Sequence, residues 1–267
     1  MDFDFNHIAV PFRMQPGLRR LAAGSPQLTP LDPDSRLYRE KEEVLQAGRS
    51  RFCVAGFDPS AAIESIAMFA DSTRAGGRFD PSIPLELGFE EDFAVLDGET
   101  GTLPWLCVCV PSHWAPEEKL GLDFMALHSP VADNAALLAA SRHLVQLATG
   151  GERWERFVWT LSPSPRYDQH PHRHARTPWP GVPAAEFGDH CFLRAERQTF
   201  FPVGRGTRQA VFTIRVMLQA LPHAVASPEK ARRLHDSLAS MSEAVLAYKG
   251  LAGAREPLLQ WLAGRMA

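Results

Sequence analysis

The sequence predicts an α+β fold in which an antiparallel sheet packs against helices. Segments of strand character gather between about residues 90 and 220, and helical patterns occur before, among and after them. Antiparallel pairing is favoured because the last two strands are joined by the short turn-forming segment PVGRGT. The chain has 267 residues, of which 45% are hydrophobic, so it can bury a sizeable core. We therefore expect a single domain over residues 1–267 with its core at about 90–220.

The first part of the chain is expected to be helical and irregular. A charged helix follows the irregular segment HIAVPFRMQPGLRRL, with Asp34 or Ser35 as its cap. Ala62, Ile66 and Phe69 recur at helical spacing and indicate a second helix. The predicted elements are helices over 33–47 and 60–70, a short apolar run over 52–54, and a loop rich in glycine, proline and acidic residues over 71–92.

The middle of the chain carries the predicted sheet. Asp97–Gly101 reads as the turn between the first two strands. The predicted strands are 93–96, 103–110, 157–161, 190–200 and 210–218. The predicted helices are 116–127, 135–148, 227–248 and 256–263, and a long loop spans 162–189. This order is that of a PAS-like domain, an antiparallel sheet with helices on one face, wrapped by additional N- and C-terminal helices.

Composition narrows the classes of partner. The formal net charge is -3 and no basic stripe is present, which argues against nucleic acid. No apolar run is long enough to span a bilayer, and the N-terminus is acidic where a signal peptide would be basic. These features predict a cytoplasmic protein that does not bind membranes. The four cysteines form no CxxC motif, so buried free thiols are a more common explanation than zinc.

The predicted hairpin at 190–218 carries charges on both of its faces. Strand alternation places Arg194, Glu196 and Gln198 on one face, and Leu193, Ala195, Arg197 and Thr199 on the other. A face turned toward a core tolerates such charges only if they are paired or bind a ligand. An exposed ladder of ion pairs and a ligand-binding site are therefore equally open interpretations.

Several other residues are candidates for chemistry. The HPHRH segment contains His170, His172 and His174, which could bind a metal, although histidines in such a loop are more often exposed. His128 ends a predicted helix, where it can cap carbonyls or serve as an axial ligand to haem iron. Lys119, in EEKLG, suits a helix start or a contact with an anionic group. Trp114 and Trp159 read as large apolar walls, which more often belong to a core than to a cofactor site.

Several segments, in order and over nearly the whole chain, resemble one family. They are PFRMQPGL, EEDFAVL, VPSHWAPEEKLGLDFMALHSPV, RFVWTL, FLRAERQTF with VFTIRVML, and AYKGL. They are similar to the haem-dependent oxidative N-demethylase family, which comprises dimethylamine monooxygenase-like haem proteins of PAS fold. One departure is Val158, which stands where that family often has asparagine.

The resemblance implies a PAS-like enzyme that binds haem b and activates O2. It implies conversion of a small secondary amine, such as dimethylamine, to a primary amine and formaldehyde. The resemblance also implies electrons from NADPH through separate flavin and iron–sulfur reductase subunits. The absence of a dinucleotide-binding motif in the chain agrees with this.

The resemblance also implies roles for individual residues. Glu196 would anchor the substrate ammonium, and Arg215 would lie across the hairpin from it, orienting the carboxylate or hydrogen-bonding iron-bound oxygen. His128 would be the iron ligand, with His170 as the runner-up. The haem carboxylates would be held by Lys119, Arg194 or Arg197, and the cofactor site would be lined by Trp114 and Trp159.

Two other functions remain open at this level. The first is a PAS-like haem sensor, although no output domain is recognisable in the sequence. The second is a haem-free, amine-binding accessory subunit of a larger monooxygenase. The presence of haem absorption distinguishes the accessory subunit from the other two, and formaldehyde release distinguishes the enzyme from the sensor.

Overall fold

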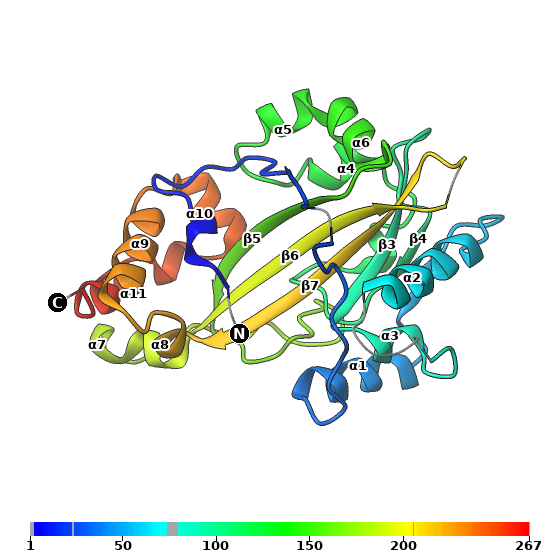
Figure 1. The fold of residues 1–267 in the computed structure, drawn as a ribbon. Coiled ribbons are helices and arrows are strands. Elements are labelled where there is room, and N and C mark those ends of the chain that lie inside the picture. The colour runs from blue at the N-terminus through cyan, green and yellow to red at the C-terminus, as the bar shows by residue number, and fades with distance from the viewer. Residues whose placement is uncertain (1–2, 23, 74–79, 205, 267) are drawn as a thin grey trace.

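The computed structural model describes residues 3–22, 24–73, 80–204 and 206–266. Its strands form one antiparallel, seven-stranded sheet in the order β1-β5-β6-β7-β3-β4-β2 (Figure 1). The predicted α+β class is confirmed. The strands are β1 (Arg19–Arg20), β2 (Arg51–Cys53), β3 (Glu91–Asp97), β4 (Trp105–Cys107), β5 (Trp154–Ser162), β6 (Phe192–Pro202) and β7 (Gln209–Ala220).

The β6–β7 hairpin forms the centre of the sheet, and its register decides which charges meet. Glu196 pairs with Val216, and Arg197 pairs with Arg215. On the other side of β6, Val158 of β5 pairs with Glu196. Because side chains alternate along a strand, Arg194, Glu196 and Gln198 share one face of the sheet, as predicted. We call this side the Glu196 face and the opposite side the Arg197 face.

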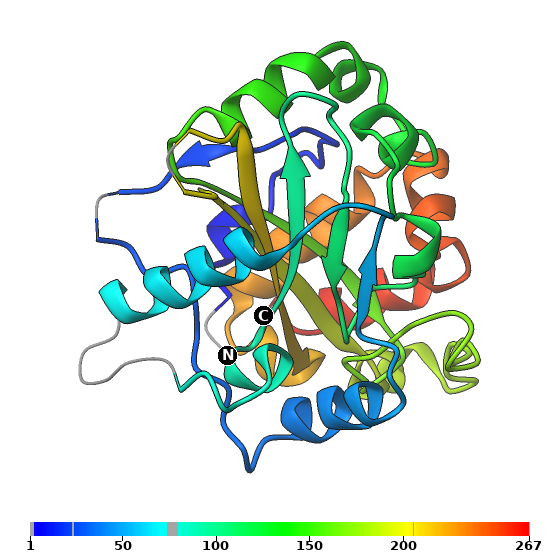
Figure 2. The same ribbon diagram turned by 90° about the vertical axis from the view of Figure 1, so that its right-hand side faces the viewer.

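Helices pack against both faces of the sheet, whereas the prediction placed the core helices on one face (Figures 1 and 2). On the Glu196 face, Ala148 of α6 packs against Ala94 and Leu96 of β3. On the Arg197 face, Ile66 of α2 packs against Phe93, while the C-terminal helices cover the ends of β5 and β6. The helices are α1 (Arg36–Gln46), α2 (Ser60–Thr73), α3 (Leu85–Gly88), α4 (Phe124–His128), α5 (Ala135–Ala139), α6 (Ser141–Thr149), α7 (Ala184–Phe187), α8 (Leu221–Ala224), α9 (Pro228–Ala239), α10 (Glu243–Lys249) and α11 (Arg255–Ala263).

Several predicted helices are interrupted by local caps and turns. The helix expected over 116–127 ends as a 3₁₀ turn at Pro116–Glu118, and Gly121 then adopts a φ of 73°. The chain re-enters a helix only after Asp123, whose carboxylate caps α4. In the same way, Ser242 caps a separate helix, so the element expected over 227–248 is divided into α9 and α10. The helices α9 and α10 are therefore separate elements.

The expected loop over 71–92 includes α3 and the start of β3, and its residues 74–79 lie outside the described part of the chain. The strand expected over 103–110 ends at Cys107, and Cys107 and Cys109 belong to different apolar clusters. All four cysteines are free, and Cys53 is exposed. Within the described residues, no helix is long and apolar enough to cross a membrane.

Candidate functional site

A row of hydrogen-bonded polar side chains occupies the Glu196 face at the middle of β6. One carboxylate oxygen of Glu196 accepts a hydrogen bond from Ser112 Oγ, and the other accepts one from Gln198 Nε2 at 2.7 Å. Arg194 Nε donates to the same Ser112 oxygen at 2.8 Å. Among the described residues, no cation forms an ion pair with Glu196, so neutral donors alone hold its carboxylate.

Arg194 forms the buried base of this row. The residue is 1% exposed, and its two remaining nitrogens donate to the carbonyls of Val110 (3.1 Å) and Arg166 (3.2 Å). Burial lowers the pKa of its guanidinium to about 10, still well above neutrality. Arg194 therefore ties the segment that carries Ser112 and the loop at Arg166 to β6.

Two side chains of this row are only partly buried, although they lie on an interior strand of the sheet. β6 is flanked on both sides by β5 and β7, yet Glu196 and Gln198 are only partly buried. Val158 and Thr160, on the same face of β5, are also partly buried. Solvent therefore reaches part of these side chains from the Glu196 face.

Arg156 lies on the same face and has no partner. It pairs in register with Gln198, next to the row. Its Nε atom is fully buried and makes no hydrogen bond, and its guanidinium forms no ion pair with any described residue. Burial lowers the pKa of Arg156, while the charges of Glu196 and Tyr248 oppose this shift. Sequence reasoning missed Arg156, although strand alternation in RFVWTL could have placed it two residues before Val158.

The end of α10 contributes two more groups. Lys249 Nζ donates to the carbonyl of Trp159 at 2.7 Å and lies 5.4 Å from the ring centroid of Phe12. Burial lowers the pKa of Lys249 to about 8, and Glu196 opposes this shift. Burial raises the pKa of Tyr248, and Glu196 raises it further. These residues, in the AYKGL motif, were not among the predicted site residues.

His128 ends α4 with one ring nitrogen engaged and the other available. Its Nδ1 lies 2.8 Å from the carbonyl oxygen of Phe124, which can only accept, so Nδ1 carries the proton. Burial lowers the pKa of the imidazole. The hydrogen bond to Phe124 opposes this shift, and the charges of Arg156 and Lys119 contribute to it. In the neutral ring, Nε2 therefore has a free lone pair, the arrangement that metal-bound histidines commonly have. The same electrostatic influence places Lys119 and Arg156 near this ring.

His170, the alternative ligand, uses both ring nitrogens. Its Nδ1 accepts a hydrogen bond from the backbone N–H of His172, so Nε2 carries the proton and donates to Glu117 at 3.0 Å. The residue is 2% exposed and crosslinks its loop to the 3₁₀ turn. Nowhere in the described residues do three or more His, Cys, Asp or Glu side chains form a group that could hold a metal ion.

His113 adds a second neutral imidazole beside the row. It directly follows Ser112 and has a φ of 60°, a conformation that residues other than glycine rarely adopt. The residue is exposed overall, but desolvation of its ring lowers the pKa of His113 to about 4, and the nearby charges of Arg176 and Arg194 contribute to this shift. Nothing in the sequence pattern marked this residue.

The expected contact between Arg215 and Glu196 is wrong. The register places Arg215 opposite Arg197, on the other face of the sheet, where it donates to Glu90 at 2.6 Å. Arg197 donates to Glu155 at 2.9 Å on that same face. Arg194 and Arg197 therefore point to opposite sides of the sheet and cannot hold the same group.

The two tryptophans also separate. Trp159 lies in the core between the Arg197 face and the C-terminal helices, where its ring meets Phe12 edge-on with the centroids 6.0 Å apart. Trp114 is partly buried and packs against Val110 and Leu106. The two rings therefore do not form the walls of one site.

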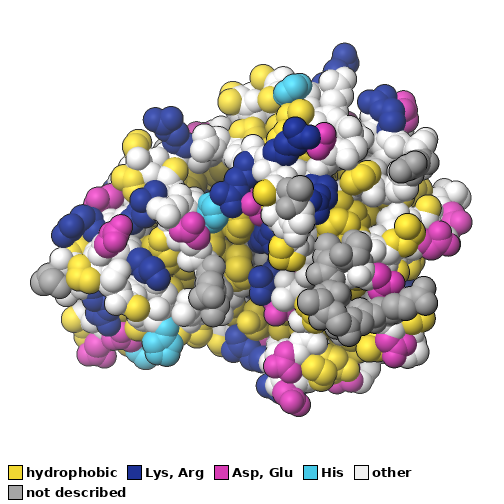
Figure 3. All heavy atoms as spheres, viewed as in Figure 1, with side chains coloured by type: hydrophobic (Ala, Val, Ile, Leu, Met, Phe, Trp, Pro, Cys, Tyr) yellow, Lys and Arg dark blue, Asp and Glu magenta, His cyan; other side chains and the backbone are white. Residues whose placement is uncertain are grey.

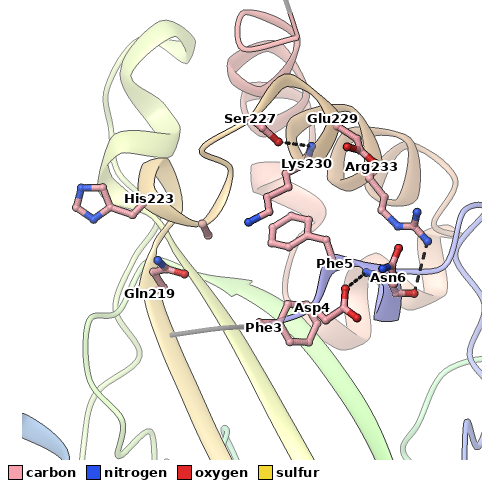
Figure 4. Close-up of a pocket in the computed structure, with 11 residues that line it drawn as sticks. Phe3, Asp4, Phe5, Asn6, Gln219, His223, Ser227, Glu229, Lys230 and Arg233 are labelled. Atoms are coloured by element: carbon pink, nitrogen blue, oxygen red, sulfur yellow. Dashed lines mark hydrogen bonds between the residues drawn. The ribbon is translucent and has the colours of Figure 1, made fainter.

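The Arg197 face is visible in the space-filling view. Figure 3 shows a hollow across its middle, in which Lys and Arg side chains lie among hydrophobic ones. A cavity of about 400 Å³ lies farther along, between the N-terminal segment and α9 (Figure 4). There Lys230 Nζ lies 5.2 Å from the ring centroid of Phe5, and Arg233 donates to the carbonyl of Ile8. Because Arg233 is held by backbone carbonyls and Lys230 lies over Phe5, both cations of this cavity are already engaged, and it is a weaker candidate than the polar row.

Comparison with known families assigns the chain to one of them. Residues 80–259, about two thirds of the chain, match the family described as "Haem-dependent oxidative N-demethylase, alpha subunit-like". The matched range includes His128, Arg156, Glu196 and Tyr248.

Proposed function

Because the chain belongs to the haem-dependent oxidative N-demethylase, alpha subunit-like family, we propose that it removes a methyl group from a small secondary amine by oxidation. The proposed substrate is dimethylamine. One methyl carbon is oxidised by O2 with two electrons and two protons, yielding methylamine, formaldehyde and water. The proposed location is the cytoplasm, and the proposed scaffold is PAS-like.

The observation that carries this proposal is the Glu196 carboxylate. It lies half-buried on an interior strand and is held by neutral donors from Ser112 and Gln198. A dialkylammonium ion is a small cation with two N–H donors, and it needs an anion when it leaves water. Glu196 would receive those donors, while Ser112 and Gln198 keep the carboxylate oriented.

The residues on this face also suit haem b. His128 would ligate the iron through Nε2, because its Nδ1 proton is held by the carbonyl of Phe124. Lys119, close enough to lower the pKa of His128, would face a haem carboxylate. Haem, when bound, would supply the redox chemistry that activates O2.

The electrons would come from a separate protein. Among its four cysteines the sequence has no CxxC motif, and it carries no glycine-rich dinucleotide motif, so nothing suggests that it binds NADPH or an iron–sulfur cluster itself. We therefore propose flavin and iron–sulfur reductase subunits as partners, with NADPH as the source of electrons.

Turnover of dimethylamine tests the proposed function. The haem-loaded protein is incubated with dimethylamine, O2 and a chemically reduced flavin, and formaldehyde and methylamine are measured. We expect both products in equal amounts, and neither without O2. A protein that binds haem but releases no formaldehyde would contradict the enzymatic function and favour the sensor. A protein without haem absorption after reconstitution would favour the accessory subunit.

A further inference from the structure

Resting on the proposed function, we propose that Arg156 is the residue that binds a carboxylate of the haem. Arg156 projects from β5 on the Glu196 face, beside the polar row and within electrostatic reach of His128. None of the sequence patterns assigned it a role. The proposal rests on the absence of any hydrogen-bond or ion-pair partner for its guanidinium among the described residues.

An unpaired guanidinium is costly where Arg156 lies. Arg156 is partly buried as a residue, but its Nε is fully buried and has no hydrogen-bond partner. The other described arginines that lack a polar partner, such as Arg13, Arg49 and Arg142, have exposed side chains. Withdrawing a cation from water without a hydrogen-bonded counterion is strongly unfavourable. The protein therefore keeps at Arg156 a site that an anion would stabilise.

The nearby carboxylate does not fill this need. Glu196 influences the pKa of Arg156, but its oxygens are engaged by Ser112 and Gln198 and form no ion pair with the guanidinium. If Arg156 formed an ion pair with Glu196, the carboxylate would attract an ammonium ion less strongly. Instead, the guanidinium of Arg156 remains available to an anion, and the carboxylate of Glu196 remains available to a cation.

Haem is the anion that suits this position. Of the three cations predicted to hold its carboxylates, Arg194 is engaged by Ser112 and two carbonyls, and Arg197 lies on the other face with Glu155. Lys119 remains near His128. A planar guanidinium can bind a carboxylate through two parallel hydrogen bonds, which an ammonium group cannot do. Arg156 would therefore orient the haem while His128 holds its iron.

The test compares haem with its dimethyl ester, whose carboxylates are blocked. Apoprotein is titrated with each compound, and absorption spectra give the affinities for the wild type, Arg156→Met and Arg156→Lys. We expect Arg156→Met to weaken haem binding by about tenfold to a hundredfold, the usual range for a charged hydrogen bond. Binding of the dimethyl ester should change little. Arg156→Lys should restore part of the affinity for haem.

Thermal unfolding of the apoprotein gives an independent readout. Removing an unpaired buried charge should raise the melting temperature of Arg156→Met, although its haem binding is weaker. Arg197→Gln is the matched control on the other face: it should lower the melting temperature and keep the preference for haem over the ester.

Three results would overturn the proposal. One is equal loss of haem and ester affinity in Arg156→Met, which would indicate a packing role. Another is unchanged haem affinity. The third is a lower melting temperature of the Arg156→Met apoprotein, which would show that the guanidinium already has a stabilising partner. A wild-type protein that binds no haem would overturn the proposed function as well.

Discussion

The two faces of strand β6 carry similar charged side chains, but these side chains have different partners. On the Arg197 face each arginine has a carboxylate: Arg197 pairs with Glu155, and Arg215 pairs with Glu90. On the Glu196 face, the carboxylate is held by neutral groups and Arg156 has no partner. One strand therefore separates arginines that have carboxylate partners from a region around Glu196 and Arg156 in which neither charge has an ionic partner within the described part of the chain.

This difference answers the question that the hairpin sequence left open. The ladder of ion pairs is present on one side of the strand, and the proposed ligand site lies on the other. Charge content alone therefore does not identify a site. The useful signal is a half-buried charge that its neighbours do not neutralise, since such a charge is costly until a ligand binds.

The largest expected effect is on catalysis. Glu196→Gln keeps the shape of the side chain but removes the charge that would receive the ammonium ion. We expect kcat/KM for dimethylamine to fall at least about thirtyfold, as for other buried charge partners. Haem absorption should be unchanged. Steady-state assays of formaldehyde release measure this, and near-normal kcat/KM would show that Glu196 does not bind the substrate.

The next effect is on stability and concerns the other face. Glu155 is 8% exposed and accepts hydrogen bonds from both Arg19 and Arg197. Glu155→Gln should lower the free energy of unfolding by about 3 kcal/mol, because it leaves Arg197 without its partner. Urea unfolding measures the change.

The matched control for Glu155 is Glu99→Gln, which removes an exposed pair with Arg208. It should cost less than about 1 kcal/mol. Equal effects of the two substitutions would contradict the view that the Arg197 face is a structural ion-pair network.

Glu91 is the exception on the Arg197 face and predicts a pH dependence. It lies opposite Arg215 in the sheet, but one of its oxygens is buried without a partner. Burial raises its pKa from 4.5 to about 7. Between these two values the folded state binds more protons than the unfolded state, so stability falls as pH rises through that window.

Glu91→Gln should remove this pH dependence. We expect the free energy of unfolding of the wild type to decrease by about 1–3 kcal/mol between pH 5 and pH 7, relative to the variant. Urea unfolding at both pH values measures the difference. Parallel pH profiles of wild type and variant would show that Glu91 is ionised in the folded protein throughout this range.

The smallest expected effect concerns Arg215. Its pair with Glu90 is partly exposed, so Arg215→Gln should lower the free energy of unfolding by about 1 kcal/mol or less. Formaldehyde release should stay within about threefold of the wild-type rate, because the side chain lies on the face away from Glu196. An activity loss as large as that of Glu196→Gln would show that Arg215 acts in the site after all.

The sequence allowed the two faces of β6 to be separated, but not the partner of each charge. Alternation in LRAERQTF sufficed to group Arg194 with Glu196. The error at Arg215 arose from the register, because shifting β7 by one residue would place Arg215 opposite Glu196 instead of Arg197. The geometry of the turn that sets this register could not be predicted from PVGRGT alone.

Groups that reach the site from distant segments were harder to predict. Arg156 comes from β5 and Tyr248 from α10, and only the folded sheet brings them near Glu196. The position of His128 was predictable because it depends on local structure, a histidine at the end of a short helix. The tautomer that leaves its Nε2 free follows from the Phe124 carbonyl one turn earlier.

Haem titration of His128→Ala, followed by absorption spectroscopy, tests the central claim most directly, that the Glu196 face binds haem through His128. We predict that the wild type binds one haem per chain with the spectrum of imidazole-ligated iron, and that His128→Ala loses this spectrum. An unchanged spectrum and affinity in the variant would contradict the claim.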